Sequence, residues 1–208
     1  MKNYITFISL VAFTGFYACS DEELPPTTSV IEFTNLKVGN YWVYDWYEIT
    51  PDGQASPFNL KDSLTIEGDT LISGRRYLIR TGTFLGNLRR ELVFDSANSL
   101  YTYPSRELIF TLDTSLEITK NFGPEENIIA VGTYSLENTP TIVDVPAGLF
   151  ECLTYAGTIE SLQSGYLYGT RHNDHQYSST IGLVSMRTYY HSSPNDLEMR
   201  LVKYGQVN

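Results

Sequence analysis

The chain has 208 residues, with 14 basic and 24 acidic side chains and a formal net charge of −10. An excess of acid this large repels nucleic acid and anionic lipid surfaces, so we do not expect a nucleic-acid partner. The length allows one sizeable hydrophobic core.

The N-terminus has the pattern of a secretory signal peptide. Lys2 precedes an apolar run over residues 4–17, and the small residue Ala18 follows it. The run is too short for a membrane-spanning helix, which needs about 20 residues. A positive start, a short apolar segment and a small residue before the cleavage site define an exported chain. We therefore expect residues 1–18 to be removed as a signal peptide.

The cleavage region also predicts a lipid anchor. Residues 16–19 (FYAC) resemble a bacterial lipobox, in which the cysteine after the cleavage site is acylated; here that residue is Cys19. Each buried CH₂ of an acyl chain contributes about 0.8 kcal/mol, and more than one chain makes anchoring effectively permanent. The alternative is an ordinary signal peptide that is cleaved elsewhere.

An acidic run directly follows the cysteine. It resembles the export signal that sends some lipoproteins of Gram-negative bacteria to the outer face of the outer membrane, and consists of Ser20, Asp21, Glu22 and Glu23. The alternatives are a periplasm-facing location and a solvated charge run without a sorting role. With the prolines at 25 and 26, residues 19–32 are interpreted as an acylated cysteine and flexible tether, and residues 33–208 as a single β-rich domain.

Alternation of apolar and polar residues dominates the domain. Trp42, Tyr44 and Trp46 share one face of an expected strand, and similar short runs recur between turn signals such as residues 51–53 (PDG) and 146–148 (PAG). This pattern predicts an all-β fold with a single antiparallel, strongly curved sheet, as a meander, half-barrel or barrel with few or no helices. Residues 106–122 are expected to be mostly strand, although their leucines also fit a helix face.

Two motifs resemble those of a family of uncharacterised Gram-negative lipoproteins. They are residues 36–44 (LKVGNYWVY) and 145–152 (VPAGLFEC), and residues 182–184 (GLV) match a later segment of the same group. The resemblance implies a curved antiparallel sheet like that of the lipoprotein-localisation carriers, and it implies no activity. Turn chemistry explains both main motifs, because Gly, Asn and Pro favour tight turns.

Known catalytic, phosphate-binding and calcium-binding motifs are missing from the sequence. We therefore assign no catalytic residues, no cofactor and no metal site. His172 and His175 are the best metal candidates, but two ligands in a polar loop favour a solvated loop instead. With Cys19 acylated, Cys152 has no disulfide partner, and we expect a small buried thiol.

Tyrosine is unusually frequent, with 16 residues, and its amphipathic side chain suits ligand surfaces. The C-terminal third contains the candidate ligand-binding residues Tyr166, Tyr168 and Tyr177. The alternative is that they only pack within strands, where tyrosine is favoured.

Three functions remain open from the sequence. The leading hypothesis is a membrane-anchored, non-enzymatic lipoprotein that binds an amphipathic ligand or a protein partner in the curve of its sheet. The alternatives are a glycan-binding accessory protein for nutrient capture, and a hydrolase whose site is assembled only in space.

Overall fold

The computed structural model describes residues 29–124, 126–163, 169–190 and 193–207. The predicted signal peptide, Cys19 and the acidic run 20–23 therefore lie outside the described residues, as do Tyr166 and Tyr168. The elements are α1 (Val30–Phe33), β1 (Tyr41–Ile49), β2 (Ala55–Ile72), β3 (Arg75–Phe84), β4 (Asn87–Ser96), β5 (Ser99–Tyr103), β6 (Leu108–Thr111), β7 (Ile118–Phe122), β8 (Ala130–Leu136), β9 (Thr141–Val145), β10 (Gly148–Ser161), β11 (Arg171–His172), β12 (His175–Ser178), β13 (Gly182–Tyr189) and β14 (Asp196–Gly205).

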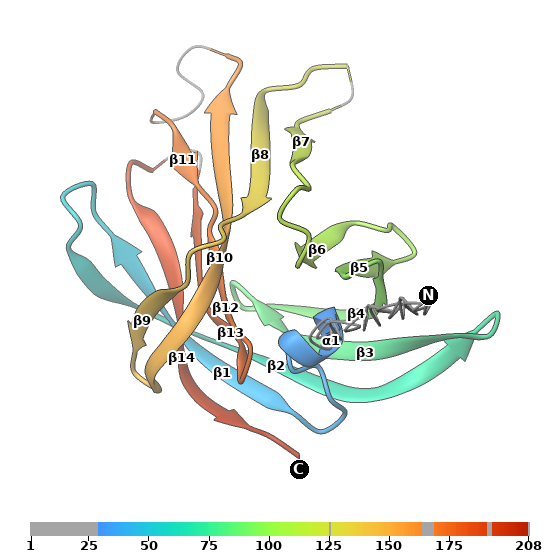
Figure 1. Cartoon of the computed structure of the whole chain (residues 1–208). Coiled ribbons are helices and arrows are strands. Elements are labelled where there is room, and N and C mark those ends of the chain that lie inside the picture. Colours follow the sequence, from blue (N-terminus) through green and yellow to red (C-terminus); the bar gives the residue numbers. More distant parts are fainter. Residues whose placement is uncertain (1–28, 125, 164–168, 191–192, 208) are drawn as a thin grey trace, which may run out of the picture.

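All strands belong to one strongly curved antiparallel sheet, as the sequence predicts (Figure 1). Its order is β6-β5-β4-β3-β2-β1-β14-β13-β12-β10-β8-β7, with β9 and β11 pairing β10 beside this path. The sheet does not close, so of the predicted forms the closed barrel is wrong, and what remains is an open, curved meander or half-barrel. The two edge strands, β6 and β7, are neighbours in sequence and come from residues 106–122, which are strand with a turn between them.

The middle of the sheet joins the two ends of the domain. Strand β1 pairs β14 on one side, with Asp45 opposite Arg200, and pairs β2 on the other, with Asp45 opposite Lys61. The first and last strands of the domain are thus adjacent and central, and the strands that follow β1 and precede β14 extend in opposite directions from this pair.

The alternating aromatic residues of β1 form the inner face, as predicted. Trp42, Tyr44 and Trp46 are at most 2% exposed. Their polar atoms are satisfied as well, because Trp42 Nε1 donates to the carbonyl of Ile181 at 2.6 Å and the Tyr44 hydroxyl to that of Leu183 at 3.0 Å. A buried tyrosine or tryptophan usually needs such a partner. These bonds tie β1 to the start of β13.

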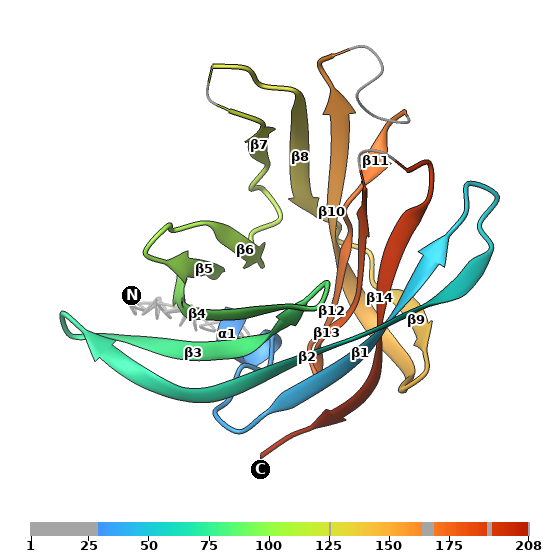
Figure 2. The same cartoon turned by 180° about the vertical axis from the view of Figure 1, so that it is seen from behind.

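The single helical turn α1 lies within the curve of the sheet (Figure 2). Ser29 and Glu32 form a capping box that starts the turn. Val30 is 1% exposed, and Phe33 stacks on Phe110 of β6 with ring centroids 5.6 Å apart. The packed domain therefore begins by residue 30, and residues 30–32, assigned to the tether from the sequence, belong to the fold.

Residues 38–40, within the first motif (36–44), form a tight turn before β1, as turn chemistry predicted. Gly39 has a φ of +92°, which glycine adopts without strain. Asn40 is fully buried; its amide donates to the carbonyl of Asn35 at 2.9 Å and its Oδ1 accepts from the Val207 N–H at 2.7 Å. Asn40 therefore joins the end of α1 to the end of β14.

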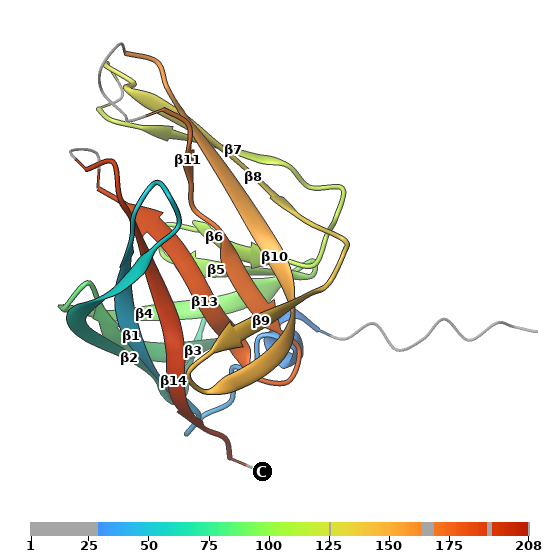
Figure 3. The same ribbon diagram turned by 90° about the vertical axis from the view of Figure 1, so that its left-hand side faces the viewer.

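The second motif forms the turn of the β9–β10 hairpin, which folds back over β13 and β14 (Figure 3). The Ala147 N–H donates to the carbonyl of Leu201 at 3.0 Å. Val143, Val145 and Cys152 are buried beneath this hairpin, whereas Ile142 and Leu149 on its other face are exposed. The buried position of Cys152 confirms its predicted packing role.

No helix in the described ranges is long and apolar enough to cross a membrane.

Candidate functional site

The concave side of the sheet encloses a cavity of about 360 Å³. Strands from both halves of the sheet contribute to it, including both edge strands. Its apolar wall consists of Leu64, Phe84, Leu108, Ile109, Phe122, Leu183, Met186 and Met199. The volume lies at the lower end of the range of small-molecule sites, about 300 to 1,000 Å³. It suits one small ligand and not a two-chain lipid.

Four tyrosines line the same cavity: Tyr44, whose hydroxyl donates to the carbonyl of Leu183, and Tyr134, Tyr155 and Tyr177. Tyr155 is 2% exposed and its hydroxyl has no hydrogen-bond partner among the described residues. Its ring packs against Tyr134, with centroids 5.9 Å apart, and against Phe110 at 6.0 Å. Unpartnered buried hydroxyls are rare, because losing water without a replacement costs about 1 to 3 kcal/mol.

Burial also fixes the protonation state of these hydroxyls. Burial raises the pKa of Tyr155 and of Tyr177 to about 12, and it raises the pKa of Tyr134 as well. All three therefore keep their protons at neutral pH. Each can donate a hydrogen bond to a ligand oxygen.

Cations and carboxylates meet across the cavity wall. Arg80 Nη2 lies 2.7 Å from Glu91 Oε1, in a pair with both side chains less than one-third exposed. Arg89 places its guanidinium 4.5 Å from the Phe84 ring centroid and has no carboxylate partner among the described residues. Arg89 is exposed, so this unpaired cation is in contact with solvent as well as with the cavity.

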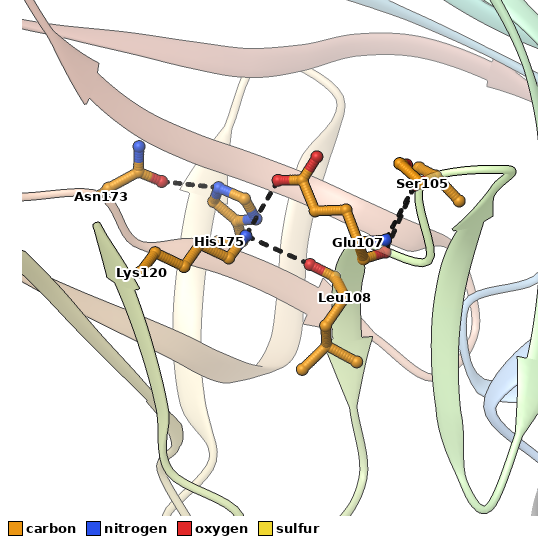
Figure 4. Close-up of polar contacts among 7 residues, drawn as sticks. Ser105, Glu107, Leu108, Lys120, Asn173 and His175 are labelled. Atoms are coloured by element: carbon orange, nitrogen blue, oxygen red, sulfur yellow. Dashed lines mark hydrogen bonds and ion pairs between the residues drawn. The ribbon is translucent and has the colours of Figure 1, made fainter. Parts of the chain in front are cut away.

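Lys120 joins the two open edges of the sheet. From β7 its Nζ donates to Glu107 Oε1 at 3.1 Å and to the carbonyl of Leu108 at 3.3 Å, at the start of β6 (Figure 4). The described parts of β6 and β7 share no backbone ladder. Because Glu107 is exposed and lines the cavity, this side-chain bridge lies where the cavity meets solvent.

His175 projects toward the same cavity and is neutral. Its Nε2 lies 2.8 Å from Asn173 Oδ1, which can only accept, so Nε2 carries the proton (Figure 4). Burial, with the nearby Lys120 and Arg80 cations, lowers the pKa of His175 to about 4. The imidazole is therefore uncharged at neutral pH.

The structure separates the residues selected from the sequence. Tyr177 lines the cavity, and its role in ligand binding stays a prediction. His172 is exposed on β11 and does not line the cavity. No group of three His, Cys, Asp or Glu side chains suited to a metal occurs in the part of the chain that is described. Burial raises the pKa of the Cys152 thiol to about 12, which makes it a poor nucleophile.

The sequence did not indicate Tyr134 and Tyr155. Tyr134 lies in the alternating strand β8 and Tyr155 in β10, where Thr154 and Tyr155 are both buried; in neither strand does the sequence pattern distinguish a packing role from a ligand-binding role. A further signal exists for Tyr134, which lies beside a glycine: a Cβ at Gly157 would clash with the Tyr134 ring. Glycine in a strand often marks a place where another group approaches closely.

Comparison with known proteins gives similarities of structure only. No protein-family model matches the chain, and no curated protein matches it. A solved Bacteroides fragilis structure, described as an exported protein with a YmcC-like fold, is 14% identical with a TM-score of 0.43, covering 82% of this chain and 97% of that one. A protein of Parabacteroides distasonis, described as a lipoprotein, is 13% identical with a TM-score of 0.38. That match covers 82% of this chain and 96% of the other. The hypothetical lipoprotein YmcC of Escherichia coli is 11% identical with a TM-score of 0.37. Here the match covers 86% of this chain and 90% of YmcC.

Proposed function

We propose that this protein is an outer-membrane lipoprotein that binds a small amphipathic molecule in the cavity of its half-barrel, without catalysis. Acylation of Cys19 anchors it, and the acidic run at residues 20–23 directs it to the cell surface. The support for the anchor is the signal peptide followed by a lipobox-like cysteine.

The observation that carries the binding proposal is the combination of an apolar cavity with an unpartnered buried hydroxyl. A cavity of about 360 Å³ with one apolar wall resembles sites that bury most of a small ligand. The Tyr155 hydroxyl lacks a protein partner among the described residues. A ligand oxygen that reached this group would offset the cost of burying it.

The charges favour binding over hydrolysis. Glu91 and Glu107 line the cavity, but each carboxylate is paired with a cation, Arg80 or Lys120. Asn173 engages Nε2 of His175, and the pKa of about 4 makes the other ring nitrogen a weak base. A hydrolase of the expected kind needs a carboxylate or imidazole free to exchange a proton with the substrate.

The two tryptophans bear on the glycan alternative. Both Trp42 and Trp46 are 1% exposed in the core, and the chain has no others. The strongest stacking side chains are therefore not on a surface where a sugar ring could lie. This favours the cavity over an exposed aromatic platform.

The test uses a neutral fluorescent ligand and a variant that fills the cavity. N-phenyl-1-naphthylamine should brighten on binding to the purified protein, because the cavity is largely apolar. Met186→Trp places a large side chain in the cavity and should abolish the signal. Leu149→Trp, at an exposed position on β10, serves as the matched control and should retain it. Absence of dye binding to the wild type, or equal binding to Met186→Trp, contradicts the proposal.

A further inference from the structure

We infer that the ligand is a single-chain amphiphile whose compact anionic head group, a carboxylate or a phosphate, is received by Arg80, Tyr155 and Tyr177. The inference rests on the proposed function, since it names the chemistry of the molecule in the same cavity. It follows from the balance of donors and acceptors, from the local charge and from the cavity volume.

Two polar side chains of the cavity, Tyr155 and Arg80, retain hydrogen-bond donors. The Tyr155 hydroxyl is buried without a partner in the described chain, and burial keeps it protonated. The Glu91 carboxylate already accepts twice, from both Nε and Nη2 of Arg80 at its Oε1, at 3.2 and 2.7 Å. A guanidinium has five N–H groups, so Arg80 retains donors beyond those that Glu91 uses. A ligand rich in acceptor oxygens satisfies this set.

Arg80 lies close enough to the tyrosines to act with them. Arg80 and Tyr177 line the cavity together, and both also line the small hollow beside Tyr44 and Leu64. The Tyr155 and Tyr177 rings both contact Phe110, with centroids 6.0 and 4.2 Å away. The two hydroxyl-bearing rings and the guanidinium therefore form one part of the cavity wall.

The charge inside the cavity is opposite to that of the whole chain. Arg80, Arg89 and Lys120 outnumber Glu91 and Glu107 in the lining, whereas the chain has a net charge of −10. Neutral His175 adds no charge. Arg89 supplies this excess and is exposed, so salt screens the attraction that it exerts on an anion, whereas Arg80 is only 18% exposed and is screened less.

The volume restricts the apolar part of the ligand. About 360 Å³ must hold the head group and the chain together. Leu183, Met186 and Met199 provide the apolar wall, and methionine adapts readily to chains of different length. One acyl or alkyl chain fits this description, and a phospholipid with two chains does not.

The experiment measures displacement of N-phenyl-1-naphthylamine by compounds with the same twelve-carbon chain. Dodecanoate and dodecyl phosphate should each displace the neutral dye at concentrations at least tenfold below those required for dodecanol. The relative strength of the two acids then identifies the head group. Equal displacement by dodecanol, or stronger displacement by dodecylamine, overturns the inference while leaving the proposed function intact. Failure of the dye itself to bind overturns the proposed function.

Two variants test which residues cause the preference for an anionic head group. Tyr155→Phe removes only the hydroxyl and should weaken dodecanoate binding about tenfold or more, the usual effect of a lost hydrogen bond to a charged group, with little change for dodecanol. Tyr47→Phe, whose ring lies under Arg200 outside the cavity lining, is the matched control and should bind as the wild type does. The paired substitution Arg80→Gln with Glu91→Gln removes both charges together and should abolish the preference for the acid. Unchanged preference in both cavity variants contradicts the assignment.

Discussion

The indole Nε1–H of Trp46 donates to Asp62 Oδ2 at 2.7 Å, deep within the sheet. The same carboxylate accepts from the backbone N–H groups of Leu85 at 2.7 Å and Gly86 at 3.1 Å. Leu85 and Gly86 have φ values of +50° and +73° and form the turn between β3 and β4. One buried carboxylate thus links the aromatic strand β1, the long strand β2 and this turn.

Asp62→Asn should therefore destabilise the domain by about 1 to 3 kcal/mol, the cost of leaving buried polar groups unsatisfied. An amide has a single acceptor oxygen, and its NH₂ group would face a donor. The measurement is the free energy of unfolding in urea. Asp69→Asn in the same strand removes an exposed ion pair with Arg76 and is the control, with an expected change below about 1 kcal/mol. Equal effects of the two substitutions refute the role of Asp62.

Trp42→Ala should cost about 3 to 5 kcal/mol of unfolding free energy, because the side chain is almost fully buried and its removal leaves a cavity. It also leaves the carbonyl of Ile181 without its donor. Urea unfolding again provides the measurement, with Tyr47→Ala on the other face of β1 as a comparison of smaller expected effect. A nearly neutral Trp42→Ala that weakens binding to an oligosaccharide would instead favour the glycan-binding alternative.

His175 should make stability depend on pH. Its pKa of about 4 in the folded protein lies below the unperturbed value of about 6.5, so the unfolded chain takes up the proton first. The stability is complete above pH 6.5 and falls as the pH decreases toward 4, by about 2 kcal/mol between pH 7 and pH 5. Urea unfolding at these two pH values tests this. The variant His175→Gln should lose most of the difference, and a wild-type-like pH dependence in that variant would show that other groups cause it.

Cys19→Ala should release the protein from the membrane fraction, because the acyl chains provide the anchor. Fractionation followed by immunoblotting detects the shift, and metabolic labelling with a fatty acid should mark the wild type alone. Cys152→Ala is the natural control, since this thiol is buried and should not affect membrane association. A mutant at Cys19 that stays membrane-bound, with an unlabelled wild type, excludes the lipid anchor.

Replacing Asp21, Glu22 and Glu23 with alanine should retain the protein inside the cell envelope. Protease added to intact cells should degrade the wild type and spare the variant, whereas both should be degraded after lysis. If the two proteins are equally accessible on intact cells, the acidic run acts only as a solvated segment.

The fold could be predicted because its strands have one clear inner face. In β1 the large aromatic side chains alternate with Val43 and Asp45, so the period of two identifies both the strand and its buried side. Whether the sheet closes could not be predicted. That depends on the edges, where short β6 and β7 meet through the side chain of Lys120, a contact that no local pattern encodes.

The site was harder to predict than the fold. In β10 the neighbours Thr154 and Tyr155 are both buried, so alternation does not mark a single inner face there. Arg80 and Glu91 are likewise brought together only by the register of β3 and β4. The cavity combines residues from many strands, and the sequence indicated only Tyr177 among its tyrosines.

The central pairing of β1 with β14 has a consequence for how the chain folds. These strands are separated by almost the whole described domain, so their ladder has a very high contact order, and such pairings form slowly. Until they meet, each half of the sheet presents a long unpaired edge, which is a template for a strand from another molecule. A β14 strand that pairs with β1 of a second copy would form the same ladder, so exchange of the last strand between two chains is the misassembly route that this topology favours.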